Sequence, residues 1–309
     1  MIFIYIIASL LIITLGVSFW AYHRAFYRSP RNFDPYDLPK GEQYEPYHEK
    51  MRALMREMEA LKGEKVSIRA YDGVKLYATY YHLSDDAPLQ IEFHGYRSDP
   101  TRDLCGGNKL SRELGHNTLV VIQRATGISG GRTITFGIKE SRDCLSWIEY
   151  AIARFGTDKK IILSGVSMGG ATVLTVNRFE LPENVVGIVA DCPFSNPKEI
   201  IKRVCKKLKY PPNVTFPFIW LGGLIFGHFS ITSTDALRAT KNAKIPILII
   251  HGEDDRFVPA YMSKDIYEGC KENCELHIFP NAGHGMSYIV DTEKYTEIVN
   301  EFTNRVLEN

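Results

Sequence analysis

The sequence has almost no net charge, few histidines and no dense cluster of cysteines. Its 37 basic and 36 acidic side chains leave a formal net charge of +1. No broad basic arm is present, which argues against nucleic acid as a partner. No histidine pair has the spacing of a zinc site. With 309 residues and 45% apolar side chains, the chain suits one large globular domain or two smaller ones.

The cysteines are too scattered for a disulfide scaffold. The six positions are Cys105, Cys144, Cys192, Cys205, Cys270 and Cys274. The last two form a lone C-x3-C pair near a predicted helix-to-strand junction, and we expect two ordinary thiols there.

The first 22 residues, MIFIYIIASLLIITLGVSFWAY, contain no charged side chain. At about 1.5 Å per residue, this run is long enough to span the roughly 30 Å hydrocarbon core of a bilayer as a helix. No lysine or arginine precedes the run and SFWAYHR is a poor cleavage site, so we predict an uncleaved anchor over 1–22 instead of a signal peptide. Aromatic residues follow where a membrane-interface belt would lie: Phe19, Trp20, Tyr22 and Tyr27.

The charges that flank this run predict its orientation. The basic residues Arg24, Arg28, Arg31 and Lys40 all follow the span. Because positive flanks stay in the cytoplasm, we expect the folded domain there. Cysteines that look unpaired agree with a reducing compartment.

Residues 23–62 are predicted to connect the anchor to the main domain. The stretch 29–47 is rich in proline and polar residues and is typical of a linker. An amphipathic helix is predicted over 46–62, because apolar residues recur there at helical spacing. These residues, which we expect to face the core, are Met51, Leu54, Met55, Met58 and Leu61.

Residues 63–309 show the pattern of an α/β domain. Asp72-Gly73 marks a hairpin between two strands. Apolar runs then alternate with helical segments, which predicts a mostly parallel sheet of about eight strands with helices on both faces. Later strands are predicted at 89–95, 117–123, 160–167, 185–192, 245–252 and 274–280, and helices at 101–115, 138–155, 168–180, 260–271 and 286–307.

The segment 196–244 is longer than one crossover helix requires, and we interpret it as a cap or lid inserted over the functional edge of the sheet. It contains a basic amphipathic helix around 198–209, whose charges suit a solvated face; contact with anionic lipid near the anchor is the alternative. The apolar run 216–229 is too short and too interrupted by glycine for a second span.

Ser167 lies between glycines at the end of a predicted strand, in the stretch GVSMGG (165–170). A strand that turns sharply into a helix strains the turn residue, and neighbours two positions away must lack side chains to avoid clashes. The pattern G-x-S-x-G meets this need and exposes the hydroxyl above the sheet edge. The N–H of Met168, at the start of the helix, faces the same space.

A serine hydroxyl needs a base, and the base needs an orienting acid. The strand that ends at 252 runs into a loop with Asp254 and Asp255, and the strand that ends at 280 runs into a loop with His284. Both loops follow the carboxyl ends of strands, where α/β sheets build their sites.

These residues give the chain a resemblance to the α/β-hydrolase superfamily of serine hydrolases. It is similar to bacterial members related to prolyl-oligopeptidase-like and monoacylglycerol-lipase-like enzymes. The matching motifs, which lie within about residues 60–309, are HGYRSDP (94–100), GVSMGG (165–170), HGEDDRFVP (251–259) and NAGHG (281–285).

The resemblance implies roles for individual residues. It makes Asp255 the acid of the triad, with Asp191 as a fallback, and it places the N–H of Tyr96 beside that of Met168 as an oxyanion hole. His94 and His251 are expected to have structural roles. The chain departs from the Asp-x-Arg-x-x-Gly pattern of many relatives after the fourth strand, where it has IQRATG (122–127), and this departure bears on substrate preference.

The predicted function is the hydrolysis of a carboxylic ester through an acyl-enzyme on Ser167, with His284 as base and Asp255 as its partner. This chemistry requires no metal or organic cofactor, and an apolar cap suits an acyl chain or aromatic group. A peptidase that acts on short peptides is the alternative within the class. A membrane-tethered binding protein on an inactive hydrolase scaffold is the alternative outside it.

Overall fold

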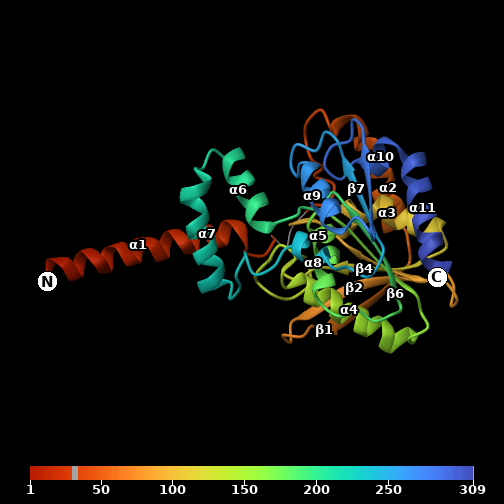
Figure 1. Cartoon of the computed structure of the whole chain (residues 1–309), viewed down its shortest axis with the longest axis horizontal. Coiled ribbons are helices and arrows are strands. Elements are labelled where there is room, and N and C mark those ends of the chain that lie inside the picture. Colours follow the sequence, from red (N-terminus) through yellow and green to blue (C-terminus); the bar gives the residue numbers. More distant parts are fainter. Residues whose placement is uncertain (30–33, 309) are drawn as a thin grey trace.

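An eight-stranded sheet forms the centre of the molecule (Figure 1). The computed structural model describes residues 1–29 and 34–308. The strand order is β1-β2-β4-β3-β5-β6-β7-β8; β2 is antiparallel to β1 and β4, and all other pairs are parallel. This topology confirms the predicted α/β-hydrolase fold. The strands are β1 (Glu64–Arg69), β2 (Lys75–Tyr81), β3 (Leu89–Phe93), β4 (Asn117–Ile122), β5 (Ile161–Val166), β6 (Val185–Asp191), β7 (Ile247–Gly252) and β8 (Cys274–Phe279).

Helices cover both faces of the sheet (Figure 1). One apolar core contains residues of α4 (Glu140–Phe155), α5 (Met168–Thr175), α8 (Ala236–Thr240) and α9 (Tyr261–Cys270). The core on the other face contains residues of α2 (His48–Glu59), α3 (Pro100–Glu113), α10 (Ser287–Val290) and α11 (Thr292–Glu308). Short 3₁₀ turns precede α2 and follow α5, at Glu45–Tyr47 and Val176–Arg178.

The burial of the strands explains their sequence patterns. Every residue of β3 and of β7 is buried, as expected for parallel strands covered on both faces, whereas β2 alternates between buried and more exposed residues. The apolar stripe of α2 faces the core as predicted, and its buried residues are Met51, Leu54, Met55 and Met58.

The predicted C-terminal helix over 286–307 is in fact two helices. Asp291 separates α10 from α11 with an extended backbone (φ −138°, ψ 81°). Its carboxylate accepts a hydrogen bond from the N–H of Lys294 at 3.1 Å. Asp291 therefore caps the start of α11, where the apolar periodicity alone indicated a continuous helix.

The expectation of free thiols at Cys270 and Cys274 is wrong, because the two residues form a disulfide. The chain turns between the end of α9 and the start of β8 and brings their Cα atoms to 5.6 Å, within the range that a disulfide needs. This pairing also removes the support that unpaired cysteines gave to a reducing compartment. The other four cysteines are free and buried.

Helix α1 (Ile2–Ala25) extends away from the sheet, and α6 (Pro197–Lys207) and α7 (Pro212–Phe226) lie beside its C-terminal half (Figure 1). It is long and apolar enough to cross a membrane, with a mean hydropathy of 2.6. We call α6 and α7 together the cap. This cap is smaller than the predicted insertion 196–244, because α8 packs on the sheet body through Ala236. Of the predicted linker and basic flank, residues 30–33, with Arg31, lie outside the described part of the chain.

Arg124, in the loop after β4, is buried between two carboxylates. Its guanidinium donates to Asp143 of α4 at 2.5 Å and to Asp72 of the β1–β2 turn at 2.9 Å. These ion pairs tie the edge hairpin and α4 to the loop that follows β4. Removal of the cation would leave Asp143 buried without its partner.

We therefore predict that Arg124→Met lowers the free energy of unfolding by about 3–5 kcal/mol. The matched control is Arg154→Met, because Arg154 forms a more exposed pair with Glu64 and should cost less than about 1 kcal/mol. Denaturant unfolding of the full chain in detergent micelles measures both. Equal losses for the two variants would contradict the assigned role of Arg124.

Candidate active site

Ser167 occupies a strained turn between β5 and α5. Its backbone has φ 57° and ψ −113°, a conformation that non-glycine residues rarely adopt. A Cβ at Gly165 would lie closer than 3.0 Å to the Gly169 carbonyl group, and a Cβ at Gly169 would lie equally close to the Phe93 carbonyl oxygen. The two glycines thus let α5 approach the ends of β3 and β5, and the turn exposes the hydroxyl at the sheet edge.

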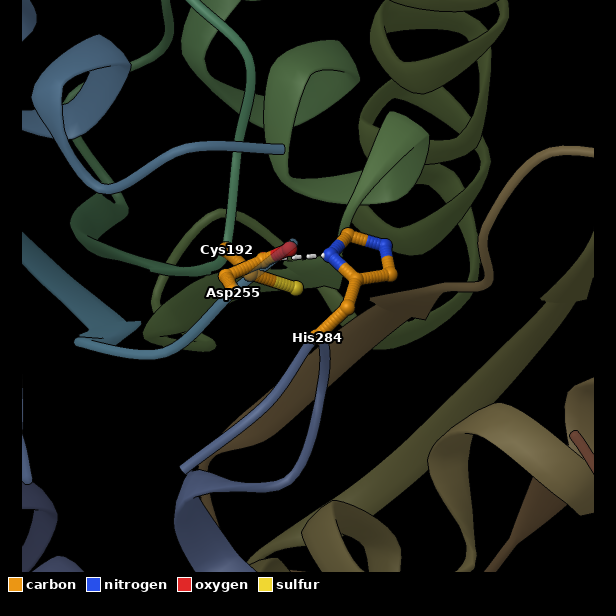
Figure 2. A group of neighbouring side chains, drawn as sticks. All are labelled: Cys192, Asp255 and His284. Atoms are coloured by element: carbon orange, nitrogen blue, oxygen red, sulfur yellow. Dashed lines mark hydrogen bonds and ion pairs between the residues drawn. The ribbon is translucent and has the colours of Figure 1, made fainter. Parts of the chain in front are cut away.

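A continuous chain of hydrogen bonds joins the three predicted residues. The Ser167 hydroxyl lies 2.9 Å from His284 Nε2, and His284 Nδ1 lies 2.6 Å from Asp255 Oδ2. Figure 2 shows the contact between His284 and Asp255 at the meeting of separate loops. With the proton on Nδ1, the imidazole donates to the carboxylate and Nε2 is free to accept the serine proton.

Asp255 is held as an ionised carboxylate. The N–H groups of Phe257 and Val258 donate to its Oδ1, each at 2.8 Å. Burial would raise its pKa, but contacts with His251 and His284 outweigh this effect and hold the pKa well below the usual range. Asp255 therefore accepts hydrogen bonds at any pH near neutrality.

His251 was expected to bond locally, and its link to the acid was missed by sequence reasoning. Its Nε2 lies 3.2 Å from Asp255 Oδ2 and 2.8 Å from the Val258 carbonyl oxygen, and its Nδ1 lies 2.6 Å from Ser263 Oγ. The four-residue spacing of His251 and Asp255 in HGEDD was the sequence signal that could have predicted this contact. His251 thus helps to position the acid through Oδ2, the same carboxylate oxygen that His284 contacts.

The fallback acid Asp191 lies outside this hydrogen-bond chain. It ends β6, and its Oδ2 accepts a hydrogen bond from the Tyr295 hydroxyl at 3.1 Å. Burial raises its pKa to about 6, although the Tyr295 bond opposes the shift. Asp254 is exposed at the surface. The histidine therefore pairs with Asp255 and with neither neighbouring acid.

Cys192 lies against the Asp255–His284 pair (Figure 2). One ligand atom from each of the three residues falls within 4.8 Å of the others, a donor set that could hold a metal ion. However, burial raises the pKa of the Cys192 thiol well above its usual range, whereas a metal binds the thiolate. The imidazole and carboxylate are also already bonded to each other, so the geometry suits proton transfer better than metal binding.

The predicted oxyanion-hole residues belong to two segments, the start of α5 and the loop after β3. Met168 is the first residue of α5, where the N–H groups have no partner within the helix. Tyr96 follows β3 in a loop that His94 fixes: His94 Nε2 accepts from the Gln123 N–H at 3.1 Å. Because burial lowers the pKa of His94, it is neutral and serves as a structural residue.

Two cavities meet at Ser167, and both are also lined by Tyr96 and Phe257. The first, of about 260 Å³, lies toward α2, α3 and α10 and includes Asp191 and Arg102. The second, of about 340 Å³, lies between the domain, the cap and α1, and apolar side chains dominate it. A molecule bound at Ser167 can therefore extend from it in two directions.

Comparison with known proteins identifies the family. The model of the prolyl oligopeptidase family matches residues 135–309, more than half of the chain. The chain belongs to the prolyl oligopeptidase family. This result agrees with the fold and makes the protein a member of the α/β-hydrolase superfamily.

Curated relatives of this family member cover much of its length. Uncharacterized protein YqkD of Bacillus subtilis is 26% identical over 198 residues, which are 64% of this chain and 65% of YqkD, slightly less than two thirds of that relative. Protein bem46 of Schizosaccharomyces pombe is 24% identical over 78% of this chain and 77% of its own. Human protein ABHD12B is 30% identical over 64% of this chain and 56% of its own.

Solved structures show the same fold. Esterase Pf2001 of Pyrococcus furiosus superposes with a TM-score of 0.67 at 23% identity, over 91% of this chain and 98% of its own. Est1E of Butyrivibrio proteoclasticus, with ferulic acid bound, gives a TM-score of 0.62 at 22% identity, over 79% of this chain and all of its own.

The close approach at the serine turn predicts the effect of adding one methyl group. Gly169→Ala should destabilise the protein and abolish labelling of Ser167 by a fluorophosphonate, since its Cβ would overlap the Phe93 carbonyl. Gly16→Ala in α1 is the control, because no atom beyond its own stretch of helix lies within 4 Å of a Cβ there and alanine favours the helix by about 0.5–1 kcal/mol. Melting temperature and labelling rate measure both variants, and unchanged labelling of Gly169→Ala would contradict the steric role of Gly169.

Proposed function

We propose that the protein is a serine hydrolase that cleaves a carboxylic ester through an acyl-enzyme on Ser167. The observation that carries this proposal is the unbroken hydrogen-bond chain from Ser167 through His284 to Asp255. The same chain argues against an inactive scaffold, which would not need to retain an activated hydroxyl beside an open cavity.

The reaction follows from the positions of these atoms. As Ser167 Oγ attacks the ester carbonyl carbon, His284 Nε2 takes its proton, and Asp255 stabilises the imidazolium. The N–H groups of Tyr96 and Met168 hold the oxyanion that forms. His284 then gives the proton to the departing alkoxide, which leaves as an alcohol. A water molecule attacks the acyl-enzyme with His284 as base again, which releases the acid and restores the serine.

Several observations favour an ester over a peptide. The larger cavity at Ser167 is walled mainly by apolar side chains, which suits an acyl chain or an aromatic group. Two proteins of the same fold are the Pyrococcus furiosus esterase Pf2001 and Est1E of Butyrivibrio proteoclasticus, the second with ferulic acid bound. The family match favours a peptidase that acts on short peptides as the second candidate.

A fluorophosphonate probe tests the nucleophile. We predict strong labelling of the wild type and no labelling of Ser167→Ala. Asp255→Asn should reduce kcat by about 10⁴-fold, because the amide no longer holds the reactive tautomer of His284. Hydrolysis of p-nitrophenyl butyrate and of aminoacyl-nitroanilides then separates esterase from peptidase. A well-folded wild type that neither reacts with the probe nor hydrolyses either substrate would refute the proposal.

We also propose that α1 anchors the protein in a membrane, with the hydrolase domain on the cytoplasmic side. The length and hydropathy of α1 support the anchor, and Arg24 and Arg28, which follow the apolar run, support the orientation. The substrate would then be a small acyl ester or short peptide on that side of the membrane.

Protease accessibility tests this orientation. In spheroplasts of bacteria that express the full chain, external trypsin should leave the hydrolase domain intact until detergent opens the membrane. Digestion of the domain in sealed spheroplasts would place it on the outer side instead.

A further inference from the structure

The apolar cavity beside Ser167 is not built from the hydrolase domain alone. Helix α1 contributes Trp20, Ala21 and Ala25 to its wall, and the cap contributes residues such as Val204 and Ile219. Because Ser167 also lines this cavity, a group bound to the nucleophile can extend directly along the predicted membrane anchor.

The cap holds α1 in this place by close packing. A Cβ at Gly222 of α7 would lie closer than 3.0 Å to the Ser18 carbonyl oxygen of α1, so the two helix backbones touch. Phe19 and Phe226 pack edge to face, with ring centroids 5.1 Å apart. The buried residues of α1 all lie near its C-terminal end, which is the part in contact with the cap.

The end of α1 is also bonded to the loop after β3, which carries the proposed oxyanion-hole residue. The hydroxyl of Tyr96 donates to the Ala25 carbonyl oxygen at 2.8 Å, and the guanidinium of Arg97 donates to the Tyr27 carbonyl oxygen at 2.8 Å. The position of α1 is therefore fixed relative to Ser167 as well as to the cap.

The wall of this cavity includes partly exposed aromatic side chains. Trp20 packs edge to face on Tyr210, with centroids 6.1 Å apart, and each residue has a little under half of its surface exposed. The exposed apolar residues Val214, Trp220 and Ile225 belong to α7, which packs beside the same end of α1. Aromatic and apolar side chains in this arrangement are typical of a membrane interface, and they suit the entry of an alkyl chain into the cavity.

We propose that α1 is a wall of the acyl-binding cavity and that Ala21 and Ala25 set the length of the acyl chain that the enzyme accepts. The alkyl chain of an amphiphilic ester lies along α1 between α6 and α7, with its carbonyl carbon at Ser167. This inference rests on the proposed ester hydrolysis and adds to it the chain's binding site and the residues that determine specificity.

Three identical substitutions in one helix provide the test. Ala21→Leu and Ala25→Leu place an isobutyl group in the cavity, whereas Ala8→Leu places it on an exposed part of α1 away from the cavity. Alanine and leucine have similar helix propensities, so the helix itself is preserved. The full chain in detergent micelles is assayed with p-nitrophenyl acetate, butyrate, octanoate and dodecanoate.

We expect both cavity variants to lower kcat/KM for dodecanoate relative to acetate by about tenfold or more. The Ala8→Leu control should keep the wild-type ratio. Melting temperature and the rate of fluorophosphonate labelling report whether each variant keeps its fold and its nucleophile. Ala21 is buried and Ala25 is partly exposed, so Ala25→Leu carries the test if Ala21→Leu disturbs the packing of α1.

The outcomes separate this inference from the function on which it rests. Labelled, active variants with the wild-type preference for chain length would overturn the role of α1 and leave the hydrolase intact. An equal shift in Ala8→Leu would overturn it as well. A wild type that hydrolyses none of the four esters would refute ester hydrolysis and the inference together.

Discussion

The candidate active site depends on the close approach of three backbone segments at the serine turn. Gly165 and Gly169 have no room for a side chain, because the Gly169 carbonyl group of α5 lies against Gly165 and the Phe93 carbonyl group at the end of β3 lies against Gly169. This contact strains Ser167 and fixes its hydroxyl near the loop that follows β3. The parallel register of β5, β6, β7 and β8 then brings the loops with Asp255 and His284 to the same edge.

A second set of contacts connects this edge to the N-terminal helix. The hydrogen bond from Tyr96 to the Ala25 carbonyl and the packing of Gly222 on α1 make α1, the cap and the loop after β3 one continuous structure. A helix that served only as a tether would not need contacts with the loop beside Ser167. The architecture is therefore suited to a substrate whose apolar part lies at the membrane while its carbonyl group reaches the serine.

Much of the fold and the candidate site could be predicted from local sequence, because the relevant signals are short. The spacing of apolar residues predicted the alternation of strands and helices. The glycines around Ser167 indicated a sharp turn at which neighbouring positions have no room for side chains. Contacts that depend on the exact path of the backbone left no such signal, even between residues three or four positions apart. The pairing of Cys270 with Cys274 required the turn between α9 and β8, and the helix break at Asp291 required the capping bond to Lys294. The spacing of His251 and Asp255 was compatible with their contact but did not reveal it. The place of α1 in the cavity wall appears only in three dimensions.

The central claim is that Ser167 carries the acyl group during turnover. Mass spectrometry of peptides from the full chain, acid-quenched while it hydrolyses p-nitrophenyl butyrate, tests this most directly. The account predicts a butyryl group on Ser167 within the peptide that spans the β5–α5 turn. Release of p-nitrophenol with the acyl group on another residue, or on none under conditions where deacylation limits the rate, would contradict it.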